Sequence, residues 1–359
     1  MIAYAVLETP DLKDAVQTLW IVQRMPELVD YIALADACGT VAEWAEARDM
    51  KETAVQYAEL AARLQPDSAS RAFTAGRLSR RMAETQRAGV WYWRSARLAR
   101  RANNNIDRAN AHLGLGNLEH DLGHYSTAER HYWKAARAAL RNGRKSLAAA
   151  AFHNLLGVTY ETGRPAEALE HLRRATEFYG QDHPRFPPFV YDAGFYLLRE
   201  GFFSSALLVF QKVLPWVETE RVGILARSAY ARAAAAVKDH IRFHRMSNVV
   251  LSMVAVDDEG SANALYQLAE GARSFLDWER AKALATRALE LAKRSDASTI
   301  PFAESLLRAI DTKAPGDLDR VPEEGDPVDW ITQEIMRKLD HRTTPPGSRA
   351  VPPEHYPTD

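Results

Sequence analysis

The chain has 359 residues, of which 47% are hydrophobic and 26% are charged, and its 46 basic residues nearly balance 47 acidic ones. This composition is typical of a folded protein and excludes disorder throughout. The net charge of −1 gives no global attraction to nucleic acid or to a membrane. The single cysteine, Cys38, excludes an intramolecular disulfide and a zinc site built from several cysteines.

The N-terminal segment carries no targeting pattern. It has no basic residues before its first acid, Glu8, so we expect no secretory signal. The sequence has no run of about 18 apolar residues, so no transmembrane helix is expected. With one cysteine, these features favour a cytoplasmic location. Residues 1–30, interrupted by Pro10 and Pro26, are expected to form short helices that cap the next segment.

An internal repeat organises residues 31–310. Its frame is set by three glycines spaced about 40 residues apart, Gly123, Gly163 and Gly201. Each is followed five residues later by an alanine and nine residues later by a large apolar residue, as in Ala128 and Tyr132. A small residue or apolar pair precedes each glycine, as at Gly116. Weaker copies on both sides bring the total to about seven units.

This spacing predicts a pair of antiparallel helices in each unit. The glycine can adopt the left-handed conformation that ends the first helix. The alanine and the aromatic residue, four positions apart, lie on one face of the second helix, and the small residue lets the two helices approach closely. Each pair exposes an apolar flank that only its neighbour covers, so the units are expected to stack into a solenoid.

The segments Leu115-Gly116…Gly123-His124-Tyr125…Ala128…Tyr132…Ala135 and Ala193-Gly194…Gly201-Phe202…Ala206…Phe210 resemble tetratricopeptide repeats. The resemblance implies an all-α fold, a right-handed superhelical solenoid of about seven helical hairpins. It also implies a non-enzymatic scaffold for protein–protein interaction. The period of 37–40 residues exceeds the family's usual 34, which predicts longer helices or loops.

Charge is unevenly distributed along the chain. Residues 71–145 hold 16 Lys and Arg against 5 Asp and Glu, whereas residues 1–70 hold 5 against 12 and residues 311–359 hold 6 against 11. Such a basic segment suits an acidic peptide, a phosphorylated segment or nucleic acid. The alternative is that the arginines only solvate helix faces. The scarcity of acids within four positions of them weighs against that alternative.

The resemblance also implies where a partner would bind, because the first helix of each unit lines the concave groove in such arrays. Leu113 and Pro188 stand where a carboxylate clamp would need basic residues, so chaperone-tail binding is not expected. Trp91, Trp93 and Trp133 fall on second helices and are predicted to pack between helices. The candidate groove residues are Arg77, Arg80, Arg81, Asn110, Asn117, His153, Asn154, Tyr191, Phe195 and Arg199.

Residues 311–359 hold eight of the 17 prolines, so most of this acidic tail is expected to be disordered. One short amphipathic helix is predicted near residues 327–340. It is either an interaction element, which could dock on the basic groove of its own chain, or a final helix packed on the array. Its apolar stripe consists of Val328, Ile331, Ile335 and Leu339.

The sequence offers no catalytic, phosphate-binding or calcium-binding motif, and we expect no enzyme, no cofactor and no metal. His240 and His244 lie four apart on a predicted helix without a third ligand. The leading hypothesis is a scaffold that binds an acidic or extended peptide. The first alternative is a bacterial-type signalling or regulatory sensor that responds to a peptide or small ligand. The second is RNA or DNA binding through residues 71–145.

Overall fold

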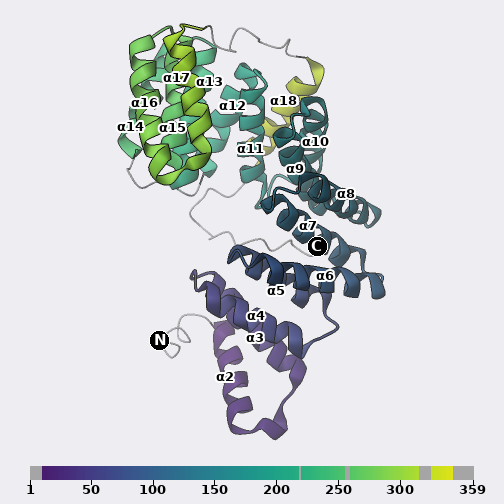
Figure 1. The fold of residues 1–359 in the computed structure, drawn as a ribbon. Coiled ribbons are helices and arrows are strands. Elements are labelled where there is room, and N and C mark those ends of the chain that lie inside the picture. The colour runs from purple at the N-terminus through teal and green to yellow at the C-terminus, as the bar shows by residue number, and fades with distance from the viewer. Residues whose placement is uncertain (1–9, 218–219, 255–258, 315–324, 343–359) are drawn as a thin grey trace. The chain divides into compact units, whose positions relative to one another are not determined.

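The computed structural model describes residues 10–217, 220–254, 259–314 and 325–342 (Figure 1). All regular elements in these ranges are helices, which confirms the all-α fold class. The described residues divide into two compact units, and the boundary falls between Phe178 and Tyr179, inside the predicted array. Residues 315–324 and 343–359, where tail disorder is expected, lie outside the described residues.

The first unit consists of helices joined by short turns. From α3 onward consecutive helices pair as hairpins, α3 with α4, α5 with α6, α7 with α8 and α9 with α10. Each hairpin also packs on the next, as the repeat predicts. The elements are α2 (Pro10–Arg24), a 3₁₀ turn (Pro26–Leu28), α3 (Tyr31–Glu46), α4 (Lys51–Leu64), α5 (Ala69–Arg81), α6 (Thr85–Arg101), α7 (Asn105–Asp121), α8 (Tyr125–Arg141), α9 (Lys145–Glu161) and α10 (Pro165–Phe178).

The second unit continues the same architecture. Its hairpins are α11 with α12, α13 with α14 and α15 with α16, so that the described residues hold seven hairpins in all. The elements are α11 (Phe186–Arg199), α12 (Phe203–Val213), a 3₁₀ turn (Leu214–Trp216), α13 (Glu220–Ala236), α14 (His240–Met253), α15 (Glu259–Ser274), α16 (Trp278–Ser295), a 3₁₀ turn (Ala297–Thr299), α17 (Ile300–Asp311) and α18 (Asp326–Asp340).

One turn geometry recurs between the helices. Gly123, Gly163 and Gly201 have φ of +74°, +70° and +87°, as predicted for residues that end a helix. The amide of the next residue then donates to a carbonyl five positions back, as from His124 to Glu119 at 2.8 Å. Residues other than glycine adopt the same conformation at turns that the glycine pattern does not mark. They are Asp49, Ala83, Asn103, Lys238, Leu276 and Lys313.

Small residues on first helices contact aromatic rings on second helices. A Cβ on Gly116 would overlap the ring of Tyr132, and one on Gly194 would stand 2.9 Å from Phe210 Cε1. Both rings are buried. The interlocking that the repeat pattern predicts is therefore present, and it sets how closely the helices of a hairpin approach.

Helix α18 packs against α12 within the second unit. Lys338 Nζ donates to the carbonyl of Tyr179 at 2.7 Å, and Arg342 Nη1 donates to the carbonyls of Gln181 at 2.6 Å and His183 at 3.0 Å. Lys212 of α12 pairs with Asp340. The apolar stripe of α18 is thus buried against its own chain. Its residues are Val328, Ile331, Ile335 and Leu339, all at most 4% exposed.

Candidate binding site

The arginines proposed for a first-helix groove hold helices together. Arg77, on α5, is 1% exposed and forms a two-pronged ion pair with Glu46 of α3. Arg81 binds the same carboxylate, and Arg80 Nη1 lies 3.0 Å from Asp121 Oδ2. Arg77 therefore does not lie on an open surface, and Arg80 and Arg81 are both committed to acids of the same unit.

The acids that neutralise these arginines come from other helices. Arg71 pairs with Asp36, 35 residues away in sequence, and Arg87 pairs with Glu59, 28 residues away. Burial acts to raise the pKa of Glu59, but hydrogen bonds from Arg87 and Trp91 and the charges of Arg87 and Arg63 together lower it. The scarcity of acids within four positions therefore does not show that these arginines lack ion-pair partners. Stacking of the hairpins brings acids from the N-terminal 70 residues against the basic segment.

The predicted asparagines lie on two neighbouring first helices. Asn117 of α7 accepts hydrogen bonds at its Oδ1 from the Tyr132 hydroxyl at 2.9 Å and from Asn154 Nδ2 of α9 at 2.8 Å. Asn110 is half-buried on α7, and His153 is half-buried on α9. Both lone pairs of the Asn117 oxygen therefore accept hydrogen bonds, and the bond from Asn154 links α7 to α9.

The remaining candidates belong to the second unit. Tyr191 and Phe195 of α11 contact each other edge to face, with ring centroids 4.8 Å apart, and Phe195 packs on Phe210 at 5.2 Å. Arg199 is exposed. Since the other seven candidates belong to the first unit, the ten positions do not form one site within either unit.

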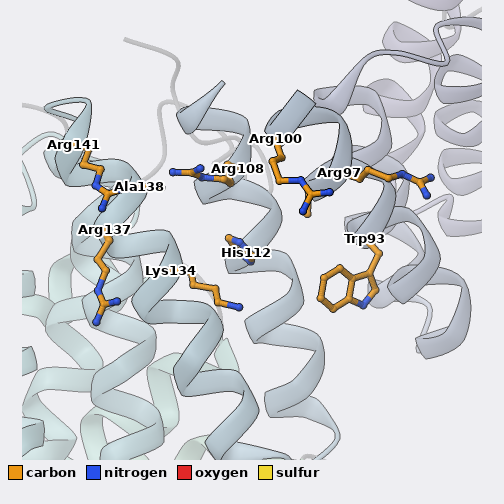
Figure 2. A pocket seen from close by; sticks show the side chains of 10 residues that line it. Trp93, Arg97, Arg100, Arg108, His112, Lys134, Arg137, Ala138 and Arg141 are labelled. Carbon is orange, nitrogen blue, oxygen red and sulfur yellow. The ribbon is translucent and has the colours of Figure 1, made fainter. Parts of the chain in front are cut away.

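A different part of the first unit is hollowed. A concavity of about 650 Å³ lies over the middle of α7, between α6 and α8 (Figure 2). We call it the basic hollow. Its lining consists of Trp93, Ala96, Arg97 and Arg100 from α6, Arg108 and His112 from α7, and Lys134, Arg137, Ala138 and Arg141 from α8.

Six of the ten lining residues are cations, and they are uncompensated. Within the described part of the chain, none of the six makes an ion pair with a carboxylate, in contrast to the arginines of residues 71–87. Asp107 precedes Arg108, but its carboxylate accepts from Asn104 Nδ2 at 2.8 Å. Six uncompensated cations of the basic segment thus line one hollow.

Two neutral histidines lie beneath these cations. His112 Nδ1 and His131 Nδ1 are 3.1 Å apart, so one ring donates to the other. Burial, aided by Lys134, lowers the pKa of both to about 4. Trp93, at the side of the hollow, is 56% exposed and meets His131 edge to face at 5.7 Å. The hollow thus combines positive charge, a neutral imidazole and one open aromatic ring.

None of the ten predicted groove residues lines this hollow, although the basic segment that contains it was identified. The feature of the sequence that indicates the hollow is the regular spacing of basic residues on a second helix. Lys134, Arg137 and Arg141 recur every three or four positions with no acid within four positions. The family resemblance instead implied a binding groove on first helices. Trp93 was expected to pack between helices, and its exposure contradicts that, whereas Trp91 is buried and donates to Glu59.

Other kinds of site are not evident in the parts of the chain that the structure describes. There, no three His, Cys, Asp or Glu side chains gather closely enough to hold a metal ion. Likewise, none of the described helices combines the length and the apolar character needed to cross a membrane. His240 and His244 instead stack near Phe275, and His244 Nδ1 lies 2.9 Å from Arg280 Nη1.

Stacked hairpins with small-residue contacts define a helical-repeat protein. Residues 107–181 match a family model described as Tetratricopeptide repeat. This match agrees with the resemblance of the sequence to tetratricopeptide repeats. No curated protein matches the chain.

A solved structure shares the fold. A chain of the crystal structure of the APC/C hetero-tetramer Cut9-Hcn1 is 14% identical, with a TM-score of 0.55, over 86% of this chain and 54% of that chain. This chain thus spans about half the length of that relative. A tetratricopeptide repeat protein from Parabacteroides merdae ATCC 43184 is 12% identical, with a TM-score of 0.49, over 77% of this chain and 98% of that chain.

Proposed function

We propose that this protein is a non-enzymatic scaffold that binds an acidic segment of a partner protein in the basic hollow. Tetratricopeptide repeats generally serve protein–protein interaction, which supports the class of function. The observation that carries the site is the group of six cations without carboxylate partners around one concavity. An acidic segment would relieve the repulsion among these cations, and their field would speed its association.

The binding site proposed here differs from the first-helix groove, because it lies on the second helices α6 and α8 and on the first helix α7 between them. Arg77, Arg80 and Arg81 are already neutralised by Glu46 and Asp121, so an acidic partner would have to break existing ion pairs to use them. The cations of the basic hollow require no such exchange. The difference in available charge favours the hollow over the first-helix groove.

The test uses a fluorescein-labelled peptide of eight glutamates and fluorescence anisotropy. Reversing two charges from opposite sides of the hollow, with Arg100→Glu and Arg137→Glu, is expected to weaken binding at least tenfold. The matched control reverses two exposed arginines of α16, with Arg287→Glu and Arg294→Glu, and changes the net charge equally. It is expected to stay within about threefold of the unaltered protein, since long-range effects are screened by salt.

A variant of the original groove separates the two locations. Arg199→Glu alters an exposed arginine among the first-helix candidates. We expect it to bind the peptide as the unaltered protein does. If Arg199→Glu abolishes binding while the hollow variant retains it, the groove is the site and the proposal is wrong. Circular dichroism of each variant verifies that the helices remain folded.

A further inference from the structure

The arrangement of cations in the basic hollow selects among acidic ligands. The six come from three consecutive helices and surround one space, rather than following a line along the surface (Figure 2). Arg100, Arg108 and Lys134 lie on different sides of His112. A run of carboxylates spreads its charge along a peptide, whereas cations grouped around one hollow suit one group that carries more than one negative charge.

The identity of the cations points in the same direction. Five of the six are arginines, whose planar guanidinium groups bind phosphate through paired N–H donors. No described acid competes for them. The concentration of arginine forks, with no carboxylate among the lining residues, is typical of sites that recognise phosphorylated segments.

The neutral histidine adds a donor without adding charge. His112 Nδ1 is engaged with His131, which orients the His112 ring. In the tautomer in which His131 donates, His112 Nε2 carries the hydrogen and can donate to a phosphate oxygen. The ring is kept neutral by burial and by the cations around it, so it does not add to the repulsion within the empty hollow.

The aromatic residues weigh against a nucleic acid ligand. Binding of single strands relies on several rings that stack successive bases along a basic groove. Among the lining residues of the hollow, Trp93 is the one indole or phenyl ring, and the other ring is the imidazole of His112. Trp91 is buried with its indole on Glu59, and Trp133 packs on Phe152 and His171. A single exposed ring fits a side chain or backbone segment that flanks one phosphate.

From this geometry we infer that the basic hollow is a phosphate site that takes a phosphorylated side chain of a partner protein. The inference rests on the proposed function and specifies it. The phosphate would lie in front of His112 between α6 and α8, with arginines from both helices around it. Trp93 would cover the residues that flank the phosphorylated position.

The experiment uses one glutamate-rich carrier peptide whose central residue is phosphoserine, glutamate or serine, measured by anisotropy at a fixed salt concentration. The phosphoserine peptide is expected to bind at least about tenfold more tightly than the glutamate peptide, because a dianion meets several arginine forks at once. Arg100→Lys with Arg137→Lys preserves charge but removes two forks. It should lower this preference to less than about threefold and leave the glutamate peptide within about twofold.

Arg287→Lys with Arg294→Lys in α16 is the matched control and should retain the full preference. Equal binding of the phosphoserine and glutamate peptides would overturn the phosphate site while leaving the acidic-segment scaffold intact. Failure of all three peptides to bind would overturn the proposed function as well. A twelve-nucleotide uridine RNA that binds more tightly than the phosphopeptide, and competes with it, would replace the protein partner with nucleic acid.

Discussion

Arg77 and Glu46 form a buried, two-pronged ion pair between α5 and α3, with Nη1 2.5 Å from Oε1 and Nη2 2.7 Å from Oε2. Their side chains are 1% and 5% exposed. Glu46→Gln would remove the negative charge that faces this buried guanidinium, so we expect a loss of about 3 kcal/mol in the free energy of unfolding. Urea unfolding followed by circular dichroism measures it. The control Asp311→Asn, which removes an exposed pair with Lys282, should cost less than about 1 kcal/mol. Equal losses would contradict the role of burial.

Two glycines within helices are expected to respond in opposite directions to alanine. A Cβ at Gly114 would overlap the buried ring of Tyr92, so Gly114→Ala should destabilise the protein by about 2 kcal/mol. Gly157, on α9, has no atom within 4 Å of such a Cβ. Gly157→Ala should therefore stabilise by roughly 0.5–1 kcal/mol through helix propensity. Thermal unfolding distinguishes the two, and a Gly114→Ala protein as stable as the original would show that the contact with Tyr92 adjusts freely.

The histidine pair makes stability depend on pH. Both residues have a pKa of about 4 in the folded protein and about 6.5 when exposed. Between these values the unfolded chain binds more protons, so their contribution is complete above about pH 6.5 and is lost as the pH falls toward 4. We expect the free energy of unfolding to fall by about 2 kcal/mol more between pH 7.5 and 5 than in a His112→Gln, His131→Gln variant. Parallel losses in the two proteins would rule out this linkage.

The stripe of α18 is expected to stabilise the second unit. Ile335 is fully buried, so Ile335→Ala should cost about 3 kcal/mol in free energy of unfolding. Trp330, on the same helix, is 41% exposed. Trp330→Ala is the control and should cost less than about 1 kcal/mol. If both substitutions are equally mild, α18 contributes little to the stability of this unit. Hydrogen exchange at α12 amides provides an independent measure.

The repeat could be predicted from sequence because its signals are local. A glycine at each hairpin turn, with small and aromatic residues at fixed offsets, encodes both the left-handed conformation and the close contact, as at Gly123, Gly116 and Tyr132. The turns at Ala83 and Leu276 were not marked in this way, because the helices that pack on either side impose a positive φ on residues with side chains. The packing of α18 on α12 was one of two alternatives, since an apolar stripe does not name the surface that covers it.

The site was harder to predict because electrostatic neutralisation is not local. Arg77 and Arg97 look alike in the sequence, yet only Arg77 meets an acid, from a helix 31 residues away. The distribution of charge along the chain identifies residues 71–145 as basic. It does not distinguish the arginines of residues 71–87, which form ion pairs, from the six cations that line the hollow. That distinction depends on which helices stack together, and it places free positive charge on α6, α7 and α8 rather than on Arg77, Arg80 and Arg81.

The joints at the two ends of the α7–α8 hairpin are equivalent. At the first, Asn103 has a φ of +51° and the Asn104 amide donates to Ala99 at 2.9 Å; at the second, Gly143 has a φ of +66° and the Arg144 amide donates to Ala139 at 3.0 Å. Residues 105–144 are therefore one repeat unit with turns of the same geometry at its two ends. A second copy of these residues inserted after Arg144 would follow a turn of the same geometry as the one before Asn105. It would lengthen the array by one hairpin and would add a second set of the arginines on α8.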